Sequence, residues 1–349
     1  MSRLDEALKI VSISSVSRDE ARLADHIEQT LRSNPLLEVH RIGDNVVART
    51  TGIQSTRLLV AGHIDTVPGD ASKATISGEV LHGVGACDMK GSVSVMLELA
   101  LDQSPRSNEI TWVFYAREEI ARSESGLLEI AAHNPDLLAA DCAVLGEPTG
   151  GVVEAGCQGT LRVLITLKGA RAHTARPFTG RNAIHRLGQV VSQVASYEPR
   201  TVVIDDVAFT EQLQVVEISG GIAPNVVPDL ASCVLNHRVA PDRNDTEALA
   251  AIKSFIGDLL EPGDEIAITD WAPSSPPSLD STHLQRLIAL TNESPRGKVG
   301  WTDVATLQER GVPATNFGAG DPLLAHRSDE FVTLSELDQF ASVLRTWLS

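Results

Sequence analysis

The sequence is poor in the features that mark secreted, membrane-spanning or nucleic-acid-binding proteins. Its 349 residues include only four cysteines, which lie far apart and form no Cys-x-x-Cys pair, so we expect reduced thiols. No apolar run approaches the ~20 residues of a membrane span, and the charged first residues do not resemble a signal peptide. The net charge of −17 argues against nucleic acid and against anionic membranes. We therefore expect a cytoplasmic protein that binds neither nucleic acid nor membrane.

The motifs of several common hydrolase mechanisms are also missing. The sequence contains no His-Glu-x-x-His, no Gly-x-Ser-x-Gly and no phosphate-binding Gly-x-x-x-x-Gly-Lys. Gly83 and Gly85 could belong to a dinucleotide-binding pattern, but Asp88 stands where its third glycine is required. A nucleotide-binding module is therefore weakly supported.

What the sequence does contain is a set of histidine and acidic residues, each in its own short motif. They are His63 in Gly-His-Ile-Asp, Asp88 in Gly-Val-Gly-Ala-Cys-Asp-Met-Lys-Gly, Glu119 in Arg-Glu-Glu, Glu147 in Gly-Glu-Pro-Thr, and His326 in Leu-Leu-Ala-His-Arg-Ser. Two imidazoles and three carboxylates supply two terminal ligands for each of two divalent ions and one bridge between them. Each residue alone has an ordinary explanation, such as a turn, a helix cap or an exposed loop. Together they favour a two-metal hydrolase.

Two further residues beside these candidates suggest supporting roles. In an extended segment, His63 and Asp65 point to the same side, so Asp65 can accept the other ring N–H and fix the tautomer. Glu118 directly precedes Glu119, and a solvated acidic loop is the ordinary explanation for such a pair. In the functional interpretation, Glu119 binds metal, while Glu118 takes a proton from the attacking water and returns it to the leaving amine.

Hydrophobic periodicity predicts an α/β arrangement for the first part of the chain. Helices are expected at residues 4–13, 21–31 and 92–101, and strands at 57–62, 110–116 and 142–145. The three strands end next to His63, Glu118 and Glu147, respectively. Loops that follow strand ends are where open α/β sheets place catalytic groups.

The α/β pattern of the first part of the chain stops at about residue 160 and resumes after about residue 271. Strands are expected at 161–168, 212–219 and 231–239, helices at 182–195 and 245–260, and a turn-rich return at 271–277. Such an order is typical of an open α+β sandwich with helices on one face. We therefore predict a catalytic domain of residues 1–159 and 271–349 with a second domain, 160–270, inserted into it.

The motifs together resemble those of the co-catalytic zinc aminoacylase and carboxypeptidase family. Beyond the five motifs, the resemblance includes Gly-Ala-Arg-Ala-His-Thr-Ala-Arg-Pro at 169–177 and further segments at 220–229, 237–242, 302–303 and 313–318, so it covers nearly the whole chain. Residues 144–162 and 172–177 are most similar to actinobacterial members that remove succinate from N-succinyl-LL-2,6-diaminopimelate. The resemblance implies a zinc-peptidase-like catalytic domain with a mixed central sheet flanked by helices, and an inserted α+β sandwich that serves as lid and dimerisation domain.

The resemblance also implies roles for individual residues. Asp88 would bridge two zinc ions, with cobalt as an alternative, while His63 and Glu147 complete one site and Glu119 and His326 the other. Glu118 would be the general base and acid, Asp65 a catalytic residue, and His173 a group that stabilises the oxyanion from a partner subunit. Substrate contacts are expected from Asn225, Arg238, Arg176 and Thr302. The chain is then expected to be a homodimer, through the inserted domain, that acts on a small N-acyl amino acid.

The expected reaction is hydrolysis of the N-succinyl amide to succinate and LL-diaminopimelate in lysine biosynthesis. Two positions depart from the usual pattern near the substrate: Cys157-Gln158 replace an arginine that is common there, and Trp301 replaces a small polar residue. Arg176 or Arg162 could supply the missing cation, or both could be ordinary surface arginines. The alternatives are an acetylornithine deacetylase, another aminoacylase or a dipeptidase, and, from a different class, a metal-binding protein without turnover. Manganese is also compatible with the proposed ligands.

Overall fold

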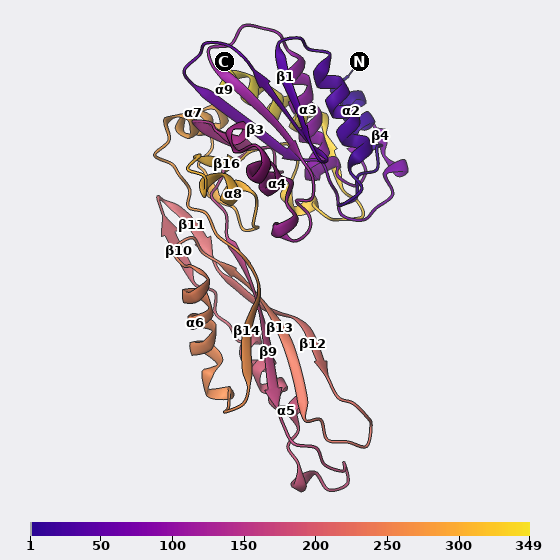
Figure 1. Ribbon diagram of the computed structural model, residues 1–349, viewed down its shortest axis with the longest axis vertical. Helices are drawn as coiled ribbons and strands as arrows, with labels where there is room; N and C mark the ends of the chain where they lie inside the picture. Colours follow the sequence, from indigo (N-terminus) through magenta and orange to yellow (C-terminus); the bar gives the residue numbers. More distant parts are fainter. Residues whose placement is uncertain (1) are drawn as a thin grey trace. The chain divides into compact units, whose positions relative to one another are not determined.

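The computed structural model describes residues 2–349, which divide into two compact units (Figure 1). The first unit contains the chain up to Gly156 together with Pro277–Arg296 and Thr302–Ser349, and the second contains Cys157–Pro276 and Gly297–Trp301. The inserted domain predicted at 160–270 lies inside the second unit. The short return Gly297–Trp301 was predicted to belong to the catalytic domain, but it lies in the second unit. Two hydrogen bonds hold it there: the Gln158 N–H donates to the Lys298 carbonyl at 3.1 Å, and Trp301 Nε1 donates to the Pro273 carbonyl at 3.1 Å.

The first unit is built on a mixed sheet, as the family resemblance implies. Its strands lie in the order β1 (Leu37–Ile42), β2 (Asn45–Thr50), β6 (Glu109–Tyr115), β3 (Arg57–His63), β7 (Cys142–Leu145), β16 (Ala314–Asn316), β8 (Glu154–Ala155) and β15 (Arg296–Gly297). β3 runs parallel to β6 and β7, and β7 runs parallel to β16. The β1–β2, β2–β6 and β16–β8 pairs are antiparallel. A small antiparallel sheet is formed by β4 (Thr75–Ser77), β5 (Val80–His82) and β17 (Phe331–Thr333).

Helices cover both faces of the large sheet because its central strands alternate their side chains between two cores (Figure 1). Leu58 and Val60 of β3 pack in a core with α1 (Arg3–Val11), α2 (Ala21–Arg32), α3 (Gly91–Leu101), α7 (Thr282–Thr291) and α9 (Leu334–Leu348). Leu59 and Ala61 pack in the opposite core with α4 (Gly126–His133) and α8 (Val304–Gln308). A strand buried on both faces is a continuous apolar run in sequence, which is why β3 was recognisable. The remaining turns of helix are η1 (Ala71–Lys73), η2 (Ala86–Lys90), η3 (Arg122–Glu124), η4 (Pro135–Leu138) and η7 (Pro322–Leu324).

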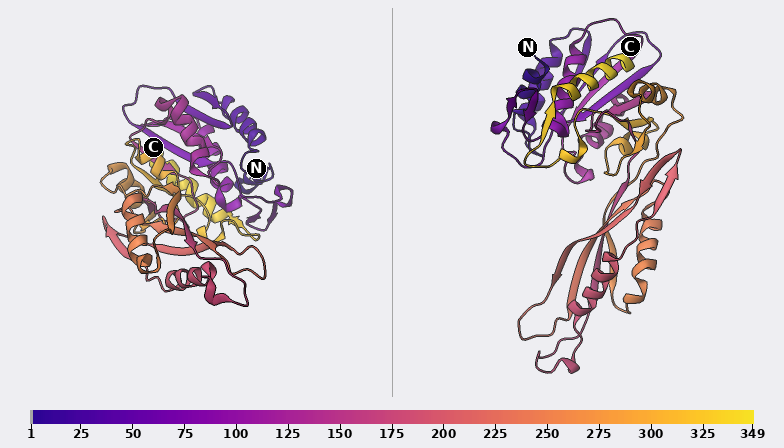
Figure 2. Two further views of the ribbon diagram at one scale, coloured as in Figure 1. Left: turned by 60° about the horizontal axis from the view of Figure 1, so that its bottom comes forward. Right: turned by 180° about the vertical axis from the view of Figure 1, so that it is seen from behind.

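The second unit is a four-stranded antiparallel sheet with two helices on one face (Figure 2). The strand order is β12 (Gln212–Gly220), β13 (Leu230–Val239), β9 (Gly159–Lys168) and β14 (Glu265–Ala272). The side chains of Leu161, Val163 and Ile165 form a core with α5 (Ala183–Ala195) and α6 (Asp245–Ile256). A hairpin, β10 (Thr201–Ile204) and β11 (Val207–Thr210), and the turns η5 (Pro177–Thr179) and η6 (Gly257–Leu259) complete the unit.

Several elements differ from the sequence prediction. The fourth strand of the second unit, β14, was missed, and its last residues Trp271 and Ala272 were placed in a turn-rich return. Exposed residues dominate β14, so it gives little hydrophobic signal. The pairs β1–β2, β4–β5 and β10–β11 were also missed. The first helix ends at Val11 rather than at residue 13 as predicted, because Ser12 is its C-cap.

Two sequence expectations concern the environment of the protein. All four cysteines are buried thiols, in agreement with the expected absence of a disulfide framework. No helix within residues 2–349 combines the length and the hydropathy needed to cross a membrane. The cytoplasmic location stays a prediction.

Candidate metal centre

Parallel strands bring the predicted ligands to one edge of the large sheet. His63 ends β3, Glu119 follows β6 and Glu147 follows β7, while Asp88 lies in η2 and His326 follows η7. All five belong to the first unit. Because β3, β6 and β7 are parallel neighbours, their carboxyl ends deliver these side chains to the same place.

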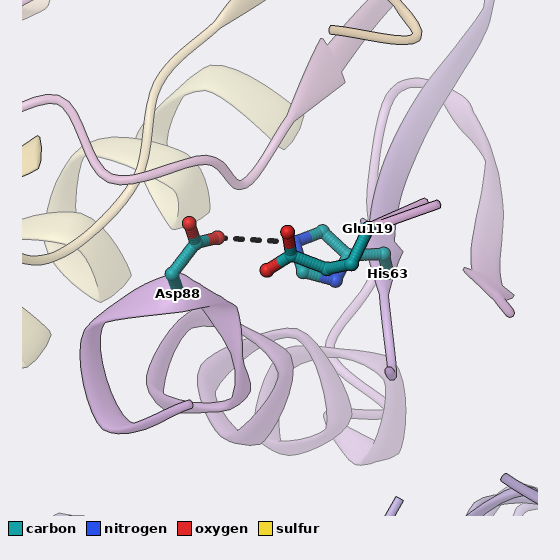
Figure 3. Close-up of side chains that lie close together, drawn as sticks. All are labelled: His63, Asp88 and Glu119. Carbon is teal, nitrogen blue, oxygen red and sulfur yellow. Dashed lines mark hydrogen bonds and ion pairs between the residues drawn. The ribbon is translucent and has the colours of Figure 1, made fainter. Parts of the chain in front are cut away.

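The ligand atoms lie close enough to share ions. One ligand atom each from His63, Asp88 and Glu119 lies within 4.8 Å of the other two (Figure 3). Asp88 Oδ1 is 3.0 Å from His63 Nε2, whereas Asp88 Oδ2 is 3.7 Å from His326 Nε2. His63 Nε2 is also 3.8 Å from Glu147 Oε1, and His326 Nε2 is 2.9 Å from Glu119 Oε2. The two oxygens of one carboxylate thus face two different histidines, as a bridging carboxylate requires.

The electrostatics of this cluster also suit cations. Burial disfavours a charged His63, yet its contacts with Asp65 and Asp88 raise its pKa well above the usual value. The neighbouring Glu119 raises the pKa of His326 to about 9. Both shifts reflect the excess of negative charge around the two imidazoles. Divalent ions would balance that charge and displace protons from the ligands. The residues present fit a pair of divalent ions.

Asp65 is fully buried and contacts more groups than the sequence indicated. His63 Nδ1 lies 3.0 Å from the Asp65 backbone carbonyl and 3.5 Å from its carboxylate Oδ1, so the carbonyl is the closer acceptor. The carboxylate accepts the N–H of Glu118 at 3.0 Å, the N–H of Glu119 at 3.1 Å and the Ser17 hydroxyl at 2.7 Å. Asp65 therefore fixes the backbone of the Glu118–Glu119 pair as well as the orientation of His63. Ser17 was missed, since a serine in a polar loop carries no motif.

Glu118 is a partly buried carboxyl group with an altered pKa. Burial, and then the nearby charge of Glu147, raises the pKa of Glu118 well above the usual value. The preceding residue, Arg117, has a φ of +62°, an unfavourable left-handed conformation for a non-glycine residue. Arg117 Nε donates to the Glu124 carbonyl at 2.8 Å and helps to hold this turn. Strained residues of this kind concentrate at functional sites.

The remaining predicted site residues divide between the two units. His173, Arg176, Asn225 and Arg238 belong to the second unit, and Thr302 belongs to the first. His173 is exposed, and its Nδ1 accepts the Ala175 N–H at 3.0 Å, so the neutral ring carries its proton on Nε2 and can donate it.

The candidate substrate contacts have ordinary partners within their own units. Arg238 Nη1 donates to Thr160 Oγ1 at 2.6 Å, and the Asn225 carbonyl accepts the Thr174 N–H at 3.2 Å. The buried Thr302 donates to Asn316 Oδ1 at 2.9 Å. Arg176 is exposed, and Arg162 pairs with Asp270 at 3.1 Å. Their roles toward substrate stay predictions.

Paired carboxylates and histidines at the strand ends, with an adjacent acid of raised pKa, are typical of a metal-dependent amide hydrolase. The chain belongs to the peptidase family M20/M25/M40, whose model matches residues 59–349. It is 43% identical to DapE of Mycobacterium tuberculosis H37Rv over 342 residues, which cover 97% of this chain and 96% of that protein. It is 40% identical to the succinyl-diaminopimelate desuccinylase of Corynebacterium glutamicum over 348 residues, with 98% and 94% covered.

Solved structures agree on the fold. A tripeptidase from Staphylococcus aureus superposes with a TM-score of 0.79 at 20% identity, covering 99% of this chain and 96% of that one. YxeP of Bacillus subtilis, a dinuclear metal-binding peptidase of the M20 family, gives a TM-score of 0.72 at 15% identity, with 99% and 96% covered. The catalytic domain with a mixed sheet and the additional α+β domain are therefore shared with this family.

Proposed function

We propose that the protein is a two-metal amidohydrolase that cleaves N-succinyl-LL-2,6-diaminopimelate to succinate and LL-diaminopimelate in lysine biosynthesis. The observation that carries the two-metal chemistry is the placement of Asp88, whose two carboxylate oxygens face His63 and His326 separately. The choice of substrate is supported by the 40% identity to the Corynebacterium glutamicum desuccinylase over nearly the whole chain.

The five ligand candidates divide into two sets around Asp88. His63 and Glu147 would hold one ion, and Glu119 and His326 the other, in keeping with their distances to the histidine nitrogens. Zinc is the proposed metal, and cobalt suits the same ligands. When bound, two divalent ions polarise the amide carbonyl and lower the pKa of a water molecule towards neutrality.

Glu118 is the proposed proton carrier. Its carboxylate would accept the proton of the attacking water and then deliver it to the departing amine nitrogen, which must leave as a neutral amine. The raised pKa of Glu118 suits both steps, because a more basic carboxylate accepts a proton more readily and can then return it to the amine. Asp65 holds the Glu118 N–H and keeps this side chain next to the ligands.

The second unit would supply the substrate contacts. His173 Nε2 is available as a donor to the oxyanion that forms on the carbonyl oxygen. Arg238, Arg176 and Asn225, together with Thr302 of the first unit, are proposed to bind the carboxylates of the substrate, for which arginine is well suited. We also propose a homodimer formed through the second unit, with His173 acting on the partner's substrate.

The substrate assignment is tested by comparing two amides on the same zinc-loaded protein. Amine release is measured with N-succinyl-LL-2,6-diaminopimelate and with N-acetylornithine, at equal concentrations and with metal content determined in parallel. The proposal predicts kcat/KM at least about 100-fold higher for the succinyl substrate, the discrimination expected when a charged acyl group has a dedicated partner. Equal or reversed preference would contradict the substrate assignment and would favour an acetyl-amino-acid deacylase.

The acetyl alternative has one observation in its favour. At the two positions that depart from the usual pattern, Gln158 Nε2 donates to the Thr210 carbonyl at 3.0 Å and Trp301 Nε1 to the Pro273 carbonyl at 3.1 Å. Neither residue supplies a cation, so a second carboxylate on the acyl group must find its partner elsewhere. This makes the substrate comparison the decisive test of the acyl group.

A further inference from the structure

Glu330 is a buried carboxylate that binds the loop carrying Asp88. It lies just before β17, four residues after His326, and its side chain is only 3% exposed. Oε1 accepts the N–H of Cys87 at 2.8 Å and the N–H of Asp88 at 2.9 Å. Oε2 accepts the N–H of Gly85 at 3.0 Å, and the Glu330 carbonyl accepts the N–H of Gly83 at 3.1 Å. One residue thus binds four backbone groups within a six-residue loop.

We propose that Glu330 is a positioning residue that sets the bridging carboxylate of Asp88 between the two metal ions. The inference rests on the proposed two-metal site and assigns Glu330 no direct role as a ligand. Its carboxylate oxygens are occupied by three N–H groups of the loop backbone. Because Glu330 follows His326 closely in the chain, it also links the loop of one terminal ligand to the loop of the bridge.

The loop itself permits little adjustment. Gly85 has a φ of +77°, and a Cβ at this position would lie 2.6 Å from Thr66 Cγ2. The turn is therefore confined on one side by Thr66 and held on the other by Glu330. An ångström of movement at Asp88 would remove the match between its two oxygens and the two histidines, because metal–ligand distances tolerate only about 0.2 Å.

A buried lysine lies in the same region as Glu330. Lys90 is fully buried, and its Nζ donates to the Ile13 carbonyl at 2.7 Å. A buried carboxylate is tolerated when it is hydrogen-bonded and compensated, and charged acceptors form stronger bonds than neutral ones. The three N–H donors of the loop and the buried lysine thus suit a carboxylate at position 330.

A purely structural role for Glu330 makes a different prediction. A carboxylate whose only function were to anchor β17 would affect folding but not metal binding. Glu336 is a matched control, because it also accepts a backbone N–H, that of Thr333 at 2.8 Å, and lies in the same segment without touching the Asp88 loop. The variants E330Q and E336Q each remove one charge while keeping side-chain volume.

The test is a calorimetric titration of chelator-stripped protein with zinc. Wild type should bind two ions, and E336Q should match it within about twofold. E330Q should bind at least one ion about 10- to 100-fold more weakly, the usual effect of losing a group that orients a ligand. E330A should be weaker still, and both should retain the wild-type circular dichroism spectrum. Equal zinc affinities for E330Q and wild type would overturn the inference. A wild type that binds fewer than two ions would instead contradict the two-metal proposal.

A second measurement needs no variant and covers the case in which the substitutions prevent folding. In stripped wild-type protein, the amide hydrogens of Gly85, Cys87 and Asp88 should be protected from exchange with solvent, because each is bonded to Glu330. Their protection should be comparable to that of β3. Rapid exchange of all three in the folded protein would overturn the inference.

Discussion

Replacing Asp65 by asparagine should impair turnover while leaving both metal ions bound. The substitution turns one carboxylate oxygen into an NH2 group and removes the charge. Oδ2 accepts two bonds, from Ser17 Oγ and the Glu119 N–H, whereas Oδ1 accepts the Glu118 N–H. The asparagine oxygen should therefore occupy the Oδ2 position, which leaves the NH2 group facing the Glu118 N–H. Two donors then oppose each other at the proposed base, while the metal ligand Glu119 keeps its bond.

The size of the effect follows from the bonds that are lost. A hydrogen bond to a charged acceptor contributes about 1.5–3 kcal/mol, and the opposed donors prevent a neutral replacement. If this cost appears as displacement of Glu118 in the transition state, kcat should fall about 10- to 100-fold. Ser17→Ala is the matched control, because it removes only the hydroxyl from Oδ2 and leaves both backbone N–H bonds. It should reduce kcat less than about 10-fold, because the two N–H bonds that position Glu118 and Glu119 remain.

The assay is amine release from N-succinyl-LL-2,6-diaminopimelate by zinc-loaded protein, with zinc content measured on the same samples. D65N with wild-type kcat would refute the assignment of Asp65 as the group that holds Glu118. D65N that has lost both ions would also refute it, because Asp65 would then act mainly through His63 and Glu119.

Three further predictions concern other residues. Glu118→Gln should lower kcat about 10²- to 10⁴-fold with two ions still bound, and a kcat near wild type in steady-state assays would remove the base assignment. His173→Ala should lower kcat about 10²-fold or more without changing zinc content, whereas loss of zinc would make it a ligand. In the second unit, Arg186 lowers the pKa of Asp264 to about 2 from 3.8, so its stabilising contribution is complete above about pH 4 and lost as the pH falls to about 2. The free energy of unfolding, measured by thermal unfolding at both pH values, should therefore change by about 1–2 kcal/mol less in D264N than in wild type. Identical profiles for the two proteins would contradict the pairing.

The sequence predicted the parts of the fold that have strong hydrophobic signals. Residues 57–62 were recognised as a strand because β3 is buried on both faces, and the alternation in β9 revealed a sheet covered on one side. β14 was missed because its side chains are largely exposed, so its place in the sheet depends on pairing with β9. Strand pairing over such a distance in sequence is not visible in local periodicity.

The candidate site shows the same division. The ligand candidates were identified because histidine and carboxylate motifs at strand ends are unusual in number and order. The partners that hold them were missed or misjudged. Ser17 and Glu330 lie in polar segments without a motif. Their partners, the Asp65 carboxylate for Ser17 and the backbone N–H groups of the Asp88 loop for Glu330, come within reach only after folding. For Asp65, the sequence suggested contact with His63, while the structure adds the bonds to Glu118 and Glu119.

The central claim is that two metal ions together support hydrolysis of the succinyl amide. The most direct measurement is amine release from N-succinyl-LL-2,6-diaminopimelate by chelator-stripped protein as zinc is added back in steps. The account predicts no release without zinc and full activity at about two equivalents, the number that the ligand set accommodates. Turnover without metal, or none despite two bound zinc ions, would contradict it.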